Sequence, residues 1–262
     1  MQLATTLRIA FFLFTFACCA TKNDASTKKD AEEWVRDSTL HFTLQAQVGV
    51  RSVDSLKSIG RKMERIQKEI LELLHESSPQ NLQLYFLKDR ATLAGYTGYS
   101  AKGYTDTQKG ILYFVDADPF HLPLNHETTH ALSWRLWGTP KEYWISEGLA
   151  VFANNNCGNY PLHVLAHALH REGKLVPFQY LVDSFDFRAL EPSLQAASVV
   201  QYIYETYGVA ALKAFWQKGW QASDSIIGLP STTLEQQWEA FIAQSTFNAV
   251  VNWEKIKTHG CE

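Results

Sequence analysis

The sequence predicts an α+β fold in which a small mixed sheet with one long helix precedes a mainly helical half. The long helix is indicated by an amphipathic run from Ser52 to Glu76, and short strand-like segments lie on both sides of it. From Leu122 onward the strand pattern almost ends and helical segments follow one another. The 262 residues, of which 46% are hydrophobic and 13% aromatic, suffice for one sizeable unit with a substantial core.

The run from Ser52 to Glu76 has the clearest helical pattern in the chain. Its apolar residues recur at steps of three and four, which places them on one face opposite charged side chains. Ser52 can cap the first turn, and Ser77-Ser78-Pro79 ends the helix. The apolar positions are Leu56, Ile59, Met63, Ile66, Ile70 and Leu73.

Three other segments have the composition or the alternation of strands. The last two are joined by a connection rich in Gly and Tyr, which includes Tyr99 and Tyr104. These tyrosines can line a cleft, although for any single one an ordinary place in a turn or on a sheet surface is more common. The three strand segments are Leu40–Ala46, Leu82–Leu87 and Gly110–Val115.

A candidate metal site follows the third strand, in the string His126-Glu127-Thr128-Thr129-His130. If the segment from Leu124 to Leu136 is a helix, His126 and His130 lie one turn apart on one face, and both imidazoles can reach one ion. Glu127 lies about 100° around the helix from His126, beside the ion rather than on it. That is the position of a general base that acts on a metal-bound water.

A catalytic zinc takes three protein ligands and keeps a fourth position for water. Glu147 is the candidate third ligand, because it follows His130 by 17 residues on a second predicted helix. The break at Gly138-Thr139-Pro140 lets this helix fold back antiparallel to the first and present its carboxylate to the ion. The sequence therefore predicts one Zn²⁺ per chain, bound by two histidines and one glutamate.

Together, His-Glu-x-x-His and the downstream Trp144-Ile-Ser-Glu147-Gly-Leu-Ala150 resemble the gluzincin group of zinc metallopeptidases, in particular the peptidase MA-like domains. The resemblance implies a zincin-like fold with the zinc site between the sheet half and the helical half. It also implies a peptide or protein substrate, whose peptide bonds are hydrolysed by a metal-activated water with Glu127 as base.

The resemblance extends loosely to two later segments. Ala197–Gly208 is similar to a helix that ends in Tyr-Gly, and Thr233–Trp238 is similar to the closing helix of such domains. One position departs, because thermolysin-like members carry an Asp four residues after the third ligand to support a zinc-bound His, and Val151 stands there. Another residue must fill that role. The donor for an oxyanion stays open, with Tyr202, Tyr204, Tyr207 or none of them as the alternatives.

Gluzincin aminopeptidases resemble one another in a Gly-x-Met-Glu-Asn segment whose carboxylate holds the free amino terminus of the substrate. This sequence has no such segment, so we expect an endopeptidase or a narrow-specificity protease, unless Asp106 or Asp116 replaces that acid. The sheet edge that pairs with an extended substrate is expected at Gly110–Phe114. The alternative function is that of an exported zinc-binding lipoprotein with a non-catalytic role in binding or assembly.

A second histidine cluster competes with the first. His163, His167 and His170 are spaced for one face of a helix after Pro161, and the first pair could bind a metal. No carboxylate lies between the pair, and the segment is apolar nearly all round. These features favour histidines that are buried or face a cleft and are satisfied by hydrogen bonds.

The amino terminus has the pattern of an export signal. Arg8 precedes the apolar run Ile9–Ala17, which is too short to span a bilayer. Next, Cys18 and Cys19 resemble a bacterial lipoprotein processing site, where an acylated Cys tethers the chain. Which of the two cysteines is processed stays open. An ordinary signal peptide, without acylation, also stays open as the alternative. We expect a membrane-anchored lipoprotein of a bacterial cell envelope, or otherwise a periplasmic or secreted protein.

The expected organisation is a signal peptide (1–18), a flexible tether (19–35), a peptidase MA-like catalytic domain (36–250) and a tail (251–262). Cys157 and Cys261 can pair in an oxidising compartment or stay apart. A formal net charge of −3 provides no basic field for nucleic acid or anionic lipid. We therefore expect no nucleic-acid partner, and a membrane contact only through the lipid anchor.

Overall fold

The computed structural model describes residues 33–116, 122–154, 156–244, 250–259 and 261. The signal peptide expected from the sequence, with Cys18 and Cys19, lies outside these ranges. Within them, no helix combines the length and the apolar composition that crossing a membrane requires.

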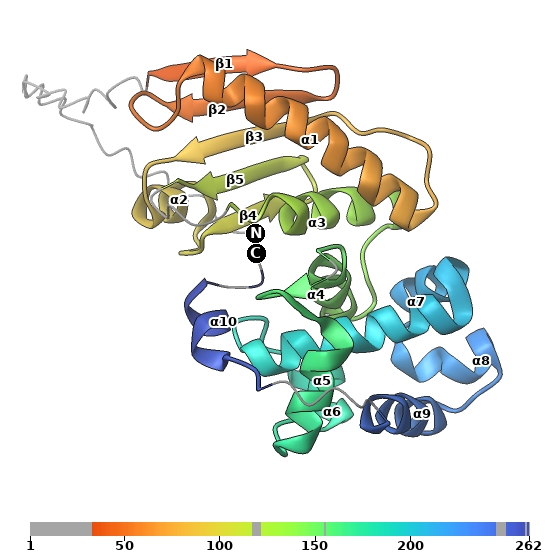
Figure 1. Ribbon diagram of the computed structural model, residues 1–262. Coiled ribbons are helices and arrows are strands. Elements are labelled where there is room, and N and C mark those ends of the chain that lie inside the picture. Colours follow the sequence, from red (N-terminus) through yellow and green to blue (C-terminus); the bar gives the residue numbers. More distant parts are fainter. Residues whose placement is uncertain (1–32, 117–121, 155, 245–249, 260, 262) are drawn as a thin grey trace, which may run out of the picture. The chain divides into compact units, whose positions relative to one another are not determined.

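A five-stranded mixed sheet forms the first half of the described chain (Figure 1). The strand order is β1-β2-β3-β5-β4, with parallel pairing from β2 through β3 to β5 and antiparallel pairing at both edges. Parallel neighbours need a crossover connection, and the helix α1 provides it between β2 and β3. The strands are β1 (Trp34–Ser38), β2 (Phe42–Gln47), β3 (Leu82–Leu87), β4 (Gly103–Asp106) and β5 (Ile111–Val115).

The edge of the sheet next to the histidine motif is β4, which corrects the expectation that Gly110–Phe114 forms this edge. β5 pairs with β3 on one side and with β4 on the other, so it lies inside the sheet. β4 has only four residues, one of them Gly103, and so short a segment carries no recognisable strand pattern. At the other edge, β1 starts at Trp34, inside the range expected to be tether.

The helix α1 (Val53–Leu74) confirms the long amphipathic helix. Ser52 caps it by accepting a hydrogen bond from the Ser55 amide at 3.2 Å. The apolar face, which includes Met63 and Ile70, is buried in the main core together with alternate residues of the strands. The side-chain spacing that predicted the helix therefore also fixes which face covers the sheet.

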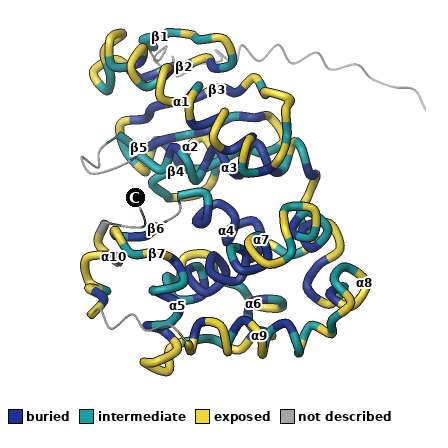
Figure 2. The backbone as a smooth tube through the Cα atoms, turned by 45° about the vertical axis from the view of Figure 1, so that its right-hand side comes forward, coloured by how far each residue is buried: buried dark blue, intermediate teal, exposed yellow. Residues whose placement is uncertain are grey.

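The helix α3 (Leu124–Trp137) carries the histidine motif and connects the two halves. It contacts α1, β4 and β5 of the sheet half and α4 (Tyr143–Phe152) of the helical half. On α4, Gly148 faces the backbone of α7, where a Cβ would lie 2.7 Å from the Ala196 carbonyl oxygen. The missing side chain allows α7 to pack directly on α4, which is buried from Trp144 onward (Figure 2).

Helices make up nearly all of the remaining chain, as the sequence predicted. The helix expected to end in Tyr-Gly is part of α7, whose helical geometry is interrupted at Gly208 with φ of 82°. The other elements are α2 (Arg90–Thr97), β6 (Asn156–Cys157), β7 (Tyr160–Pro161), α5 (Leu162–Arg171), α6 (Phe178–Ser184), α7 (Leu190–Lys218), the 3₁₀ helix η1 (Trp220–Ala222), α8 (Ser223–Ile227), α9 (Ser231–Ala243) and α10 (Trp253–His259).

Cys157 and Cys261, for which the sequence left both states open, form a disulfide. It connects β6, just after α4, to the chain end 104 residues later. Ile256 of α10 is buried next to Gly158. The range expected to be a tail thus contains a packed helix and a cysteine that is covalently linked to the segment following α4.

Candidate metal centre

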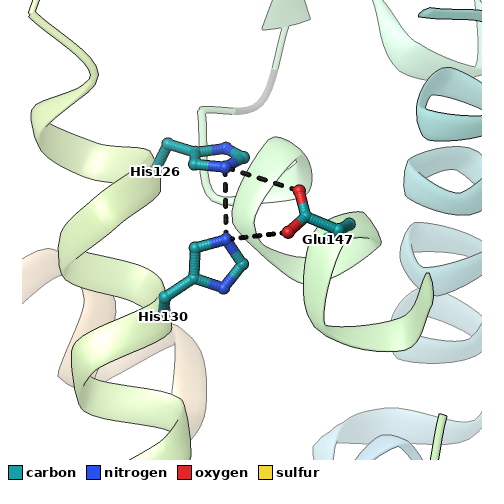
Figure 3. Close-up of side chains that lie close together, drawn as sticks. All are labelled: His126, His130 and Glu147. Carbon is teal, nitrogen blue, oxygen red and sulfur yellow. Dashed lines mark hydrogen bonds and ion pairs between the residues drawn. The ribbon is translucent and has the colours of Figure 1, made fainter. Parts of the chain in front are cut away.

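His126, His130 and Glu147 converge from two helices (Figure 3). The Nε2 atoms of His126 and His130, one turn apart on α3, lie 3.2 Å from each other. From α4, Glu147 places one carboxylate oxygen 3.6 Å from His126 Nε2 and the other 3.3 Å from His130 Nε2. Among the described residues, this is the only group of three or more His, Cys, Asp or Glu side chains whose donor atoms could hold a metal ion.

The geometry of this group fits zinc. Bonds of about 2.0–2.1 Å in a tetrahedral arrangement place two donor atoms roughly 3.3 Å apart, and the three separations above are close to that value. Two imidazoles and one carboxylate are also a ligand set of catalytic zinc sites, which leave the fourth position open. The three side chains are therefore arranged to hold a metal ion of this kind.

Burial and mutual charge set the protonation of the three side chains. Burial, together with the neighbouring His130, lowers the pKa of His126 to about 4. Burial alone would raise the pKa of Glu147, but the two histidines outweigh it and the pKa falls to about 2. At His130 the Glu147 carboxylate outweighs burial and raises the pKa. Competition between protons and a metal ion is therefore stronger at His130 than at His126.

Ser146 fills the supporting role that the sequence left without a residue. Its Oγ lies 3.0 Å from His130 Nδ1 and accepts a hydrogen bond from Trp134 Nε1 at 3.0 Å. A hydroxyl can both donate and accept, so it can accept from Nδ1–H when Nε2 faces a metal. A ligating His needs such a partner to fix its tautomer. Ser146 directly precedes Glu147, so the same helix supplies a ligand and the support for another.

Glu127 is not one of the three grouped donors, and its carboxylate contacts the edge strand β4. Thr105 of β4 donates a hydrogen bond to Glu127 Oε2 at 2.6 Å. At Gly103, a Cβ would lie 2.6 Å from Glu127 Oε1, so a side chain at position 103 would require this carboxylate to shift. Burial raises the pKa of Glu127 to about 7. No pattern in the sequence pointed to Thr105, because β4 has no recognisable strand pattern.

Tyr143, the first residue of α4, contributes a hydroxyl to this group of side chains. It hydrogen-bonds to the Glu147 carboxylate, and burial followed by that negative charge raises the pKa of Tyr143. The tyrosines considered from the sequence make other contacts. Tyr207 bonds to Gln237 at 3.0 Å, while the rings of Tyr202 and Tyr204 pack against Phe241 and Phe152.

The second histidine cluster does not converge on a common point. His163 Nδ1 lies 2.8 Å from Ser198 Oγ, and His163 Nε2 lies 3.2 Å from Glu205. His167 Nδ1 donates to the Ile242 carbonyl at 2.9 Å. Each of these two rings has its own hydrogen-bond partner, as the apolar pattern of α5 favoured.

Neither a protein-family model nor a curated protein sequence matches this chain. Among solved structures, it is similar to a mutant form of the M1 zinc metallopeptidase from Deinococcus radiodurans, with a TM-score of 0.43 and 13% identity. The match covers 83% of this chain and 53% of the other, so the chain spans about half the length of that structure.

Proposed function

We propose that this protein is a zinc-dependent peptidase in which His126, His130 and Glu147 bind the metal and Glu127 is the general base. The observation that carries the proposal is the different placement of four side chains, two histidines and two glutamates. Three of them bring their donor atoms within 4.8 Å of one another, whereas Glu127 is buried beside them and hydrogen-bonded to Thr105. A structural zinc site would leave such a carboxylate without a use.

In the proposed hydrolysis, each residue of the site has its own role. Zinc held by His126, His130 and Glu147 would supply Lewis-acid activation of water and of the scissile carbonyl. Glu127, whose pKa of about 7 lies close to neutral pH, would accept a proton on its carboxylate and return it to the leaving amine. Thr105 holds the Glu127 carboxylate, Ser146 orients His130, and Tyr143 orients Glu147.

Endopeptidase action is favoured over aminopeptidase action by the acids near β4. An aminopeptidase needs a carboxylate that pairs with the substrate's ammonium group, because an unpaired buried charge is costly. Asp106 is paired with Lys109 at 2.9 Å, and Asp116 forms a two-pronged pair with Arg51. The missing Gly-x-Met-Glu-Asn segment would have supplied a carboxylate for the substrate's ammonium group. Asp106 and Asp116 could have replaced that carboxylate, but each already has a cationic partner.

The test is a comparison of zinc content and turnover in two variants. Glu127→Gln is expected to keep about one zinc per chain and to lose turnover by roughly 10²- to 10⁴-fold, whereas His130→Ala loses the metal. The substrate is an internally quenched peptide, with and without a blocked amino terminus, and the blocked form should be cut as well as the free one. Zinc-loaded wild type that cuts neither peptide would move the assignment to a non-catalytic zinc-binding role.

We further propose that the protein acts at the cell envelope, tethered through an acylated Cys18 or Cys19. The disulfide between Cys157 and Cys261 supports an oxidising compartment. Replacing both amino-terminal cysteines by Ser should move the protein from the membrane fraction to the soluble fraction, since one or more acyl chains would supply the anchor. A wild type that is already soluble contradicts the lipid anchor and leaves the peptidase proposal untouched.

A further inference from the structure

A cavity of about 320 Å³ lies where helices of the two halves meet, and it is separate from the metal donors. Cavities that bind small ligands measure about 300–1,000 Å³. The helix α1 of the sheet half provides one part of the lining, and α4 and α7 of the helical half provide another (Figure 1). None of the three proposed metal ligands lines this cavity.

The walls of the cavity are largely apolar. Ile66, Ile70 and Leu73 recur at helical spacing on one face of α1. The helical half adds Phe152, the last residue of α4, whose ring packs against that of Tyr204 of α7 with centroids 5.3 Å apart. An apolar stem leaves water in such surroundings, and each buried methylene strengthens binding about fourfold.

Glu205 of α7 is held at the cavity by neighbours that carry no positive charge near neutral pH. Its Oε1 accepts a hydrogen bond from Gln201 Nε2 at 2.7 Å, and its Oε2 lies 3.2 Å from His163 Nε2. Burial lowers the pKa of His163, so the imidazole is neutral near pH 7. Among the described residues, the Glu205 carboxylate therefore has no cationic partner at that pH.

A second carboxylate at the cavity belongs to Glu69 of α1. Its partner is Arg65, one turn earlier, whose Nε lies 3.6 Å from Glu69 Oε1. The two side chains are 66% and 57% exposed, and an ion pair this open to water contributes little. No Lys or Arg is among the described residues that line the cavity. The lining therefore combines apolar walls with two carboxylates and no cation.

We propose that this cavity binds an alkyl cation, that is, an ammonium or guanidinium group on an apolar stem. The stem packs against the apolar face of α1 and the aromatic rings, and the cation pairs with the carboxylates of Glu69 and Glu205. A free alkylamine and a Lys or Arg side chain of a peptide share this chemistry. The inference goes beyond the proposed peptidase function and does not depend on it, because no metal ligand lines the cavity.

The experiment titrates zinc-loaded wild type with small probes near pH 7, and ligand-observed NMR measures the binding. n-Hexylammonium should bind about 10- to 15-fold more tightly than n-butylammonium, because two more methylenes are buried. It should also bind about fivefold more tightly than 1-hexanol, which has the same stem without the charge. Equal binding of n-hexylammonium and 1-hexanol, or no binding of either, overturns the proposal.

Two substitutions alter the cavity, and a matched one does not. Glu205→Gln keeps the shape of the side chain and removes its charge, so the advantage of n-hexylammonium over 1-hexanol should fall to about twofold. Ala153→Leu adds three carbons at the wall of the cavity and should weaken both probes. The control is Glu72→Gln, which removes a carboxylate of α1 that pairs with Lys68 and does not line the cavity. Zinc content checks that each variant is folded, and an equal effect of Glu72→Gln and Glu205→Gln contradicts the assigned site.

Further arms of the titration separate the two sources of the cation and exclude the metal. Acetyl-lysine methylamide is compared with acetyl-norleucine methylamide, which lacks the amine. A preference of about fivefold for the lysine compound assigns the site to a peptide side chain, whereas binding of n-hexylammonium alone assigns it to a free amine. Binding should be unchanged in the metal-free protein; its loss on zinc removal would place the amine at the metal and refute the proposal. Peptidase activity decides the proposed function separately.

Discussion

The helices α3 and α5 each carry a histidine in nearly the same surroundings, yet of the two only the α3 histidine belongs to a group of described residues that could hold a metal ion. On α3, His130 has Ser146 Oγ 3.0 Å from its Nδ1, and that hydroxyl also accepts from the indole of Trp134. The other ring nitrogen faces Glu147 at 3.3 Å. A histidine, a serine, a tryptophan and a glutamate thus form one connected group.

The same four residue types occur around α5. There, Ser198 Oγ lies 2.8 Å from His163 Nδ1 and accepts from Trp238 Nε1 at 3.1 Å. Nε2 of His163 lies 3.2 Å from Glu205. The distances match those on α3 within a few tenths of an ångström, so the local hydrogen bonds do not distinguish the two places.

The difference lies in the second histidine and in the burial of the acid. His126 turns its Nε2 to the same point as His130, whereas His167, at the equivalent helical spacing, donates to a backbone carbonyl. The Glu147 side chain is 8% exposed and the Glu205 side chain 49%. A metal site therefore requires a third donor that converges on the same point in buried surroundings. The helical spacing of two histidines or a Ser partner does not suffice.

The sharpest test of this comparison is to remove one histidine from each helix. His130→Ala should abolish stoichiometric zinc binding, because only two donors remain. His163→Ala should keep about one zinc per chain, since its group lacks a third donor. Elemental analysis after dialysis against buffered zinc measures both, and loss of zinc in both variants would show that α5 also contributes to metal binding.

Metal removal should have the next largest effect. With free zinc at about 100 times its dissociation constant, binding stabilises the folded state by about 2.7 kcal/mol, which corresponds to roughly 5–10 °C in the unfolding midpoint of a protein of this size. Thermal unfolding with and without chelator should show this difference in wild type and in His163→Ala. His130→Ala should not respond to the chelator; a response as large as that of wild type contradicts the assigned ligands.

The paired serines provide a finer test. Ser146→Ala should weaken zinc binding about 10- to 100-fold, as is typical when the partner of a ligating His is removed. Ser198→Ala should leave zinc affinity unchanged, although both variants leave a tryptophan N–H without an acceptor and should cost about 1–3 kcal/mol of stability. Competition with a fluorescent chelator measures the affinities. Equal weakening by both substitutions would mean that general destabilisation, not support of His130, is responsible.

The smallest expected effect is a pH dependence at α5. Burial lowers the pKa of His163, although the facing Glu205 opposes this shift, and Ser198 and the ring of Phe241 are its other neighbours. A lowered pKa in the folded state means that the stability contribution is complete above the unfolded pKa of about 6.5 and is lost as the pH falls through the folded pKa. Metal-free His163→Asn should therefore lose less unfolding free energy than metal-free wild type between about pH 7 and pH 5. Urea unfolding at both pH values checks the sign, and an equal or larger loss in the variant would refute it.

Elements with a strong local pattern could be predicted from the sequence. The apolar spacing from Leu56 to Leu73 identified α1, and β3 was predicted with its observed bounds. β4 could not be predicted, because four residues that include Gly103 and pair only at the sheet edge have neither length nor alternation. This also hid a residue of the site, since β4 supplies the Thr105 hydroxyl that hydrogen-bonds to Glu127.

The sequence by itself determined the histidine pair and the helix that presents it. The spacing of His126 and His130 follows from 3.6 residues per turn, so the relation between them is local and needs no knowledge of the fold. The same holds for the position of Glu127 to one side of the pair. These are properties of a single helix.

The tertiary structure alone decided which distant side chains complete the site. Ser146 contacts His130 because α4 packs on α3, Tyr143 of α4 hydrogen-bonds to Glu147, and Cys157 pairs with Cys261. The histidines of α5 do not form such a group, because His167 turns to the Ile242 carbonyl and the Glu205 side chain is half exposed, although their helical spacing equals that of His126 and His130. Such choices depend on how whole helices pack together, and the packing is set by many weak contacts across the core rather than by any short pattern in the chain.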